Sequence, residues 1–141
     1  MKNEFLAKSN GETIMEHTEN LISNLKNFFI IYSEINVDKK LLLLACIYHD
    51  LGKINKKFQS KLSGKRQNGE LPHGLLSTSF IDSKSLSENG FDKSDIKILS
   101  YSVALHHERD ISEIEEEDFE TEITRRDMAK FKRNLITTAL P

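Results

Sequence analysis

Apolar residues recur along most of the chain at the three- and four-residue steps that are typical of amphipathic helices. The clearest run extends from Ile14 to Tyr32 and predicts one long helix. Thr13 and Glu16 form the Thr-x-x-Glu pattern of a capping box, which predicts that this helix begins there. No stretch alternates between apolar and polar residues as a half-buried strand does, so the pattern favours an all-α fold.

A second predicted helix follows Asp38, which is placed to act as its N-cap. Its residues from Leu41 to Tyr48 are apolar almost all round, so we expect this helix in the middle of the core. We expect it to end near Gly52. Cys46 lies within the apolar run and is interpreted as a packing residue.

The remaining segments predict shorter helices separated by loops. Residues 55–62 read as a short basic helix, and two glycines and a proline in residues 63–72 indicate a loop. Three further helices are predicted: residues 74–86, a helix from Asp92 or Ser94 to Ala104, and residues 125–138. The expected architecture is therefore one domain over residues 1–141, a bundle of about five to seven helices.

The composition is that of an ordinary folded domain. Of the 141 residues, 30% are charged and 38% are hydrophobic, which excludes a disordered tail and an integral membrane protein. The longest apolar run, Leu41 to Ile47, is too short to cross a bilayer. One cysteine cannot form an internal disulfide, and the first ten residues lack an apolar signal segment, so we expect a cytoplasmic protein.

Charge is distributed unevenly along the chain. The net charge is −2, but residues 108–122 carry nine acidic residues and one arginine, a net −8, which leaves +6 on the other 126 residues. Residues 53–66 hold six basic residues and no acidic one. The net charge of −2 argues against uniform nucleic-acid binding over the whole surface, but it permits local binding along residues 53–66, the basic track. The acidic segment is interpreted as a solvated loop, with a flap or a surface for a protein partner as alternatives.

Five histidines carry the candidate chemistry. Each lies near a predicted helix end or in a first turn, where side chains from several helices can meet: His17, His49, His73, His106 and His107. Asp50 follows His49 at the end of the most apolar helix, and burying this polar pair is costly unless a partner satisfies it. Imidazoles and carboxylates are metal ligands, so the pattern predicts a metal site. Each motif alone is weak, because a lone histidine is more often a surface or core residue.

Four ordered blocks of sequence between residues 5 and 109 resemble a known family. The blocks are Phe5-Leu6-Ala7-Lys8-Ser9 with Gly11-Glu12-Thr13 and Glu16-His17, then His49-Asp50-Leu51-Gly52-Lys53-Ile54-Asn55-Lys56-Lys57-Phe58-Gln59, Pro72-His73-Gly74-Leu75-Leu76-Ser77, and Ala104-Leu105-His106-His107-Glu108-Arg109. They are similar to the HD superfamily of metal-dependent phosphohydrolases. More narrowly, they resemble the HD nuclease of type I CRISPR systems, which is the nuclease part of the CRISPR nuclease–helicase.

The resemblance implies an HD-domain helical bundle around a centre for two divalent metal ions. The ligands that it implies are His17, His49, Asp50, His73, His106 and His107, with Asp50 bridging the ions. Histidine-rich ligation favours manganese, nickel, cobalt or iron, with magnesium as the alternative. The family also uses a later aspartate, and neither Asp110 nor Asp127 matches its motif. We therefore expect either a chain truncated at its C-terminal end or a compact variant with an incomplete ligand set.

The same resemblance implies a metal-dependent nuclease that cleaves single-stranded DNA during CRISPR interference. RNA is an alternative substrate, and metal-activated water is the expected nucleophile. Asp50 and Lys53 are the predicted catalytic residues, and Lys53 is expected to face the scissile phosphate. The implied partners are the CRISPR helicase, fused or as a separate chain, and the CRISPR surveillance complex; no membrane is implied.

The basic track supplies the predicted contacts to nucleic acid, which are Lys53, Lys56, Lys57 and Lys61. Phe58 lies among them and is interpreted as a core residue in preference to a base-stacking one. Two other functions stay open from the sequence. One is an HD phosphohydrolase that acts on a nucleotide, and the other is a catalytically incomplete binding or accessory module.

Overall fold

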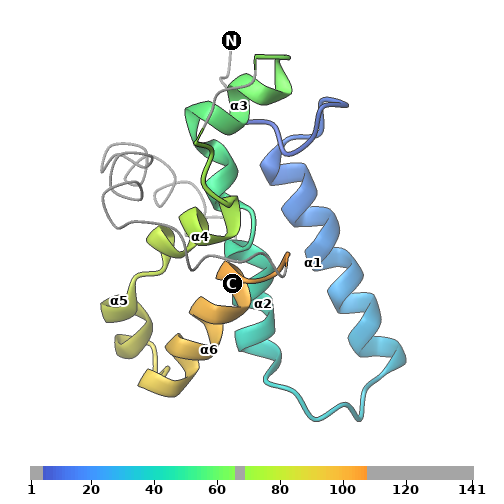
Figure 1. The fold of residues 1–141 in the computed structure, drawn as a ribbon. Coiled ribbons are helices and arrows are strands. Elements are labelled where there is room, and N and C mark those ends of the chain that lie inside the picture. Colours follow the sequence, from blue (N-terminus) through green and yellow to red (C-terminus); the bar gives the residue numbers. More distant parts are fainter. Residues whose placement is uncertain (1–4, 66–68, 108–141) are drawn as a thin grey trace.

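A computed structural model describes residues 5–65 and 69–107, and these residues are all-helical (Figure 1). The described elements are α1 (Ile14–Ile31), α2 (Lys39–Tyr48), the 3-10 helix η1 (Leu51–Ile54), α3 (Lys56–Leu62), α4 (His73–Ser77), the 3-10 helix η2 (Thr78–Phe80), α5 (Ser83–Glu88) and α6 (Lys93–Ala104). The described ranges contain no strand, only an isolated bridge between Leu6 and Thr13. The predicted all-α fold is confirmed, and the six α-helices of the described residues lie within the predicted range of five to seven.

Capping side chains fix the helix starts where the sequence predicts them. At α1 the Glu16 amide donates to Thr13 Oγ1 (3.1 Å), and the Thr13 amide donates to Glu16 Oε2 (2.8 Å), which completes the predicted capping box. The Asp38 carboxylate accepts from the Leu41 amide at the start of α2. At α6 the residue that caps is Asp92, which accepts from the Asp95 amide.

The described core contains two apolar clusters that meet at the end of α2. The first cluster contains Ala7, Ile14, Leu51, Ile54 and Phe80, and the second contains Leu86, Leu99 and Val103. Tyr48, the last residue of α2, packs against both clusters. Helix α2 itself lies between α1 and α6 (Figure 1). The chain segment directly after Tyr48 is therefore held on both sides by packed side chains.

The expectation that α2 lies in the middle of the core is wrong for the described residues. Only Ile47 of this helix is buried, and Leu42 is 36% exposed. Cys46 is half-buried, and this burial raises the pKa of its thiol. The helix contacts α1 on one side and α6 on the other, which leaves the rest of its surface uncovered by described residues.

Helix α2 also ends at Tyr48, before the predicted end near Gly52. The cause is the hydrogen bonding of Gly52, whose amide donates to the Ser77 hydroxyl (2.8 Å) and not to a carbonyl of its own helix. Continuing α2 would require that amide to donate to a carbonyl oxygen of the preceding helical turn, so α2 ends and the chain continues as η1.

The predicted helix over residues 74–86 is wrong as a single element. The structure divides it into α4, η2 and α5. The break comes at Asp82, whose carboxylate accepts a hydrogen bond from the Ser85 amide and caps α5. Aspartate competes in this way with the continuing helix, which explains a break that apolar periodicity does not reveal.

Among the described residues, no helix has the length and apolarity that a membrane crossing requires. The predicted helix over residues 125–138 and the acidic segment 108–122 lie outside the described residues.

Candidate metal centre

Two glycines allow the backbone segments that carry the histidines to approach one another closely. A Cβ atom on Gly52 would lie 2.1 Å from the carbonyl oxygen of His73, so η1 contacts α4 backbone to backbone. A Cβ atom on Gly74 would lie 2.7 Å from the carbonyl oxygen of Ala104 and 2.9 Å from His106 Nδ1. Helix α4 therefore packs between η1 and the end of α6, and this packing brings His73 and His106 toward the residue before η1, Asp50.

Ser77 fixes the same contact with hydrogen bonds. Its hydroxyl is fully buried, accepts from the Gly52 amide at 2.8 Å, and lies 2.8 Å from the carbonyl oxygens of both His49 and His73. One hydroxyl thus joins the end of α2, the start of η1 and the first residue of α4. This arrangement holds the backbone on both sides of Asp50.

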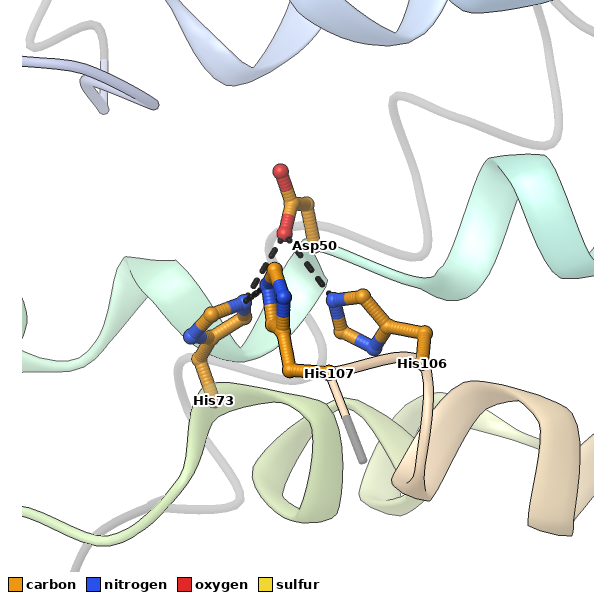
Figure 2. Close-up of side chains that lie close together, drawn as sticks. All are labelled: Asp50, His73, His106 and His107. Carbon is orange, nitrogen blue, oxygen red and sulfur yellow. Dashed lines mark hydrogen bonds and ion pairs between the residues drawn. The ribbon is translucent and has the colours of Figure 1, made fainter. Parts of the chain in front are cut away.

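Asp50 lies at the centre of the site and is 2% exposed. Its Oδ1 atom is 3.1 Å from His73 Nε2 and 3.7 Å from His106 Nε2 (Figure 2). His107 completes this side of the carboxylate, because its Nε2 atom is 3.1 Å from His73 Nε2. Figure 2 shows the three imidazoles, which come from α4 and the end of α6, gathered around the carboxylate. These four residues form one group that could hold a metal ion.

The second oxygen of Asp50 faces another pair of histidines. Asp50 Oδ2 is 3.3 Å from His17 Nε2 on α1 and 3.3 Å from His49 Nε2 at the end of α2. His17, His49 and Asp50 form the second group that could hold a metal ion. Asp50 is therefore shared by both groups, with one oxygen directed at each. All six residues that the sequence predicted as ligands lie in these two groups.

The hydrogen bonds of the imidazoles orient their Nε2 atoms toward the carboxylate. His49 Nδ1 donates to the carbonyl oxygen of Cys46 (2.8 Å), and His106 Nδ1 donates to the carbonyl oxygen of Val103 (2.7 Å). Because a carbonyl oxygen can only accept, the hydrogen of each neutral ring lies on Nδ1 and the Nε2 lone pair is free to bind a cation. This arrangement is the one that metal-binding histidines adopt.

Two buried atoms of the centre have no hydrogen-bond partner among the described residues. They are Asp50 Oδ1 and His106 Nε2. Both present lone pairs to each other, and a buried polar atom without a partner costs about 1–3 kcal/mol. A cation between them would satisfy both atoms at once, so the residues present fit a bound metal ion.

The protonation states of Asp50 and His73 also suit metal binding. Burial acts to raise the pKa of Asp50, but the imidazoles of His106, His49 and His73 around the carboxylate outweigh it and hold that pKa well below its usual range. Burial lowers the pKa of His73. The carboxylate is therefore ionised and the His73 imidazole is neutral near pH 7, which are the forms that bind metals.

Lys53 and Phe58 lie beside the carboxylate. The Lys53 ammonium is 2.7 Å from Asp50 Oδ2, and only 11% of its side chain is exposed. It also lies 5.5 Å from the centre of the Phe58 ring, which in turn packs edge-on against His73. Phe58 is 8% exposed, which confirms the interpretation as a core residue.

The rest of the basic track lies on and after α3. Lys56 is exposed, Lys57 Nζ donates to the carbonyl oxygen of Gly69 (3.0 Å), and Lys61 Nζ pairs with Glu70 (2.9 Å). The pair with Glu70 neutralises part of the charge that the sequence attributes to this segment.

Sequence reasoning missed three residues that build the centre, which are Glu12, Ser77 and Gln59. Glu12 Oε1 accepts from His17 Nδ1 at 3.1 Å, and Gln59 Nε2 donates to the carbonyl oxygen of Lys53 at 2.7 Å. All three lie within the sequence blocks that resemble the HD nuclease family, and this is the signal that could have found them. The candidates for a later aspartate, Asp110 and Asp127, lie outside the described residues.

A comparison with protein families agrees with this arrangement. Residues 11–140 match the family model described as "Cas3, HD domain". The resemblance seen in the sequence is thereby confirmed. No significant match was found among curated proteins or among solved structures.

Proposed function

The chain belongs to the Cas3 HD domain family, the nuclease domain of Cas3 in type I CRISPR systems, and from this premise we propose that it cleaves single-stranded DNA as a metal-dependent phosphodiesterase. The observation that carries the proposal is the Asp50 carboxylate, whose two oxygens face two separate groups of histidines. A carboxylate shared in this way is suited to bridge two ions, and paired ions are a recurring means of phosphodiester hydrolysis.

The proposed ligands are His17 and His49 on one side of Asp50, and the three remaining histidines on the other. When bound, the ions supply an activated water near neutral pH and neutralise the charge that develops on the phosphate. The protein holds the ligands in place through hydrogen bonds to Nδ1 and excludes bulk water from the buried carboxylate. Such orientation avoids the cost of arranging the ligands during the reaction.

The chemistry of the donor atoms supports a transition metal. Imidazole nitrogens outnumber carboxylate oxygens in both groups. Manganese, iron, cobalt and nickel accept such ligands, whereas magnesium prefers oxygen and keeps several waters. We therefore propose two ions of this class, with magnesium as the weaker alternative.

Lys53 is the proposed contact to the reacting phosphate. Its ammonium is already within the buried centre, next to the carboxylate that both groups share. A lysine in this position can bind a phosphate oxygen as a point charge. Lys56, Lys57 and Lys61 continue from it along α3 and are the proposed contacts to the DNA backbone. The proposed partners are the CRISPR helicase and the surveillance complex that expose the single strand.

A cleavage assay across divalent metals tests the proposal. The 141-residue chain is incubated with single-stranded DNA, single-stranded RNA or nucleotides, each with manganese, cobalt, nickel, iron or magnesium. We expect DNA cleavage with the transition metals, and we expect Asp50→Ala to abolish it. Equal cleavage by Asp50→Ala would refute the metal-centre assignment. Hydrolysis of nucleotides without cleavage of DNA would identify a nucleotide phosphohydrolase instead, and DNA binding without any cleavage would identify an accessory module.

A further inference from the structure

The segment before α1 folds into a compact loop around Glu12. The Glu12 carbonyl oxygen accepts from the Ala7 amide (2.7 Å) and the Lys8 amide (3.3 Å), and its own amide donates to Asn10 Oδ1 (3.1 Å). Ala7 is 3% exposed and belongs to the first core cluster. The backbone of Glu12 is therefore held in place by hydrogen bonds within the loop and by the burial of the loop in the core.

The Glu12 side chain joins this loop to the candidate metal centre. Its Oε1 atom accepts from His17 Nδ1 at 3.1 Å, and its Oε2 atom pairs with the Lys8 ammonium at 2.7 Å. An ionised carboxylate can only accept a hydrogen bond, and both ring nitrogens of His17 face one, Glu12 at Nδ1 and Asp50 at Nε2. The contact with Glu12 is the shorter one and has the geometry of a hydrogen bond, so it favours the ring hydrogen of neutral His17 on Nδ1. The Nε2 lone pair then faces Asp50 Oδ2, 3.3 Å away.

His17 differs from the other oriented histidines in the source of its acceptor. His49 and His106 follow the ends of α2 and α6, where the carbonyl oxygens of the last turn are free to accept. His17 lies in the first turns of α1, where the carbonyl oxygens are taken by the helix itself. Its Nδ1 atom therefore needs an acceptor from outside the helix, and Glu12 supplies one that carries a charge.

Gln59 fixes the loop relative to the rest of the centre. Its side-chain amide donates to the carbonyl oxygen of Leu6 (2.9 Å) and accepts from the Leu6 amide (3.1 Å). The same Nε2 atom donates to the carbonyl oxygen of Lys53, in η1 (2.7 Å). The loop and the segment after Asp50 are thus held by one side chain of α3.

We propose that Glu12 is a positioning residue that fixes the tautomer and orientation of His17 and thereby sets the metal affinity of the group formed by His17, His49 and Asp50. The inference rests on the metal centre of the proposed function but not on the substrate. It extends the functional site to the loop over residues 5–12, which contains no metal ligand of its own.

The test compares Glu12→Ala, Glu12→Gln and the control Glu19→Ala in the full chain. Glu19 is an exposed acidic residue on α1, so its removal changes the net charge equally. Nitrogen-15 NMR of the metal-free chain reports the His17 tautomer, and calorimetric titration with Mn²⁺ alone reports metal affinity. We expect wild type and Glu19→Ala to hold the Nδ1–H tautomer, and Glu12→Ala to lose it. A glutamine side chain is uncharged but its carbonyl oxygen can still accept, so Glu12→Gln should restore the tautomer in part.

The expected loss of Mn²⁺ affinity in Glu12→Ala is about 10- to 100-fold, confined to one of two binding events. Retention of the Nδ1–H tautomer in Glu12→Ala would overturn the inference, as would an unchanged affinity or an equal loss in Glu19→Ala. If wild type binds Mn²⁺ but does not cleave DNA, the proposed function is wrong while the inference about Glu12 can still hold. If wild type binds no Mn²⁺ at all, both proposals are overturned.

Discussion

At the scale of single residues, the geometry of the candidate metal centre depends on the side chains that hold the histidines and Asp50 in place as much as on these residues themselves. Ser77 joins three backbone segments through one buried hydroxyl. The chain also contains Ser79, whose hydroxyl oxygen is buried and has no hydrogen-bond partner among the described residues. The two serines therefore differ in hydrogen bonding while both hydroxyls are covered by protein.

The first prediction compares Ser77→Ala with Ser79→Ala. Ser77→Ala leaves the Gly52 amide and the His49 carbonyl oxygen without the hydroxyl, which should lower the free energy of unfolding by about 1–3 kcal/mol. Ser79→Ala removes a buried hydroxyl that has no hydrogen-bond partner among the described residues, so the free energy of unfolding should stay unchanged or rise. Urea denaturation followed by circular dichroism measures both. Equal destabilisation by the two substitutions would contradict the assigned role of Ser77.

Much of the residue chemistry could be predicted from the sequence, because it depends on neighbours along the chain. The capping box at Thr13 and the pair His49-Asp50 are visible as local patterns. The contact of Glu12 with His17 depends on the folded loop before α1, and the bonds of Ser77 depend on how α4 meets η1 and the end of α2; apolar periodicity encodes neither. The family resemblance was needed to assign the histidines to one centre, since their separation along the chain does not bring them together.

At the scale of elements, the position of α4 determines the geometry of the site. This five-residue helix is too short to be stable alone, so its place depends on contacts with η1 and α6. Those contacts require the absence of side chains at Gly52 and Gly74. The sequence predicted a longer helix here because Leu75, Leu76 and Phe80 keep a helical spacing, whereas the capping effect of Asp82 outweighs that pattern.

The second prediction compares Gly52→Ala with Gly64→Ala. Alanine at Gly52 forces η1 away from α4, which should cost about 1–3 kcal/mol or more and displace Asp50 from His73. Gly64 has a φ of +80° but no atom within 4 Å of an added Cβ, so alanine there strains only the backbone. Gly52→Ala should therefore lower Mn²⁺ affinity, whereas Gly64→Ala should leave it unchanged. Calorimetric titration with Mn²⁺ at a temperature where both variants are folded measures the affinity. A Mn²⁺ affinity in Gly52→Ala equal to that of wild type would argue against the close contact between η1 and α4.

At the scale of the whole molecule, the candidate metal centre and the basic track should affect two different properties, which are stability in the presence of metal and DNA binding in the presence of salt. The candidate centre should link metal binding to stability, because the residues that could hold an ion come from α1, the end of α2, α4 and the end of α6. The track should link DNA binding to salt. Each property can be changed without altering the residues that carry the other.

The third prediction concerns metal and stability. Mn²⁺ at 100 times its dissociation constant should raise the free energy of unfolding by about 2.7 kcal/mol per site, and a chelator should remove the gain. Thermal melting with and without Mn²⁺ measures the effect. Asp50→Ala should show no such gain. A gain of wild-type size in that variant would mean that the ion binds elsewhere.

The fourth prediction concerns salt and the basic track. Replacing Lys56, Lys57 and Lys61 by alanine should weaken binding to single-stranded DNA and reduce the slope of log affinity against log salt by about 2. The matched control replaces the exposed lysines Lys26, Lys84 and Lys93, which removes the same charge from other helices. Fluorescence anisotropy over a range of salt concentrations measures both. Equal slopes of log affinity against log salt in the two triple variants would show that the basic track does not contact the DNA.

The shared position of Asp50 has a consequence for folding. Its histidine partners begin at His17 and end at His107, so the two groups unite the first and last helices of the described chain. Neither group can be complete until the helices that carry its ligands have docked. Metal binding at either group would therefore require the folded arrangement of these helices, and an ion bound there would act as an internal cross-link between segments far apart in the sequence. A nuclease built in this way would stay inactive while it is incompletely folded.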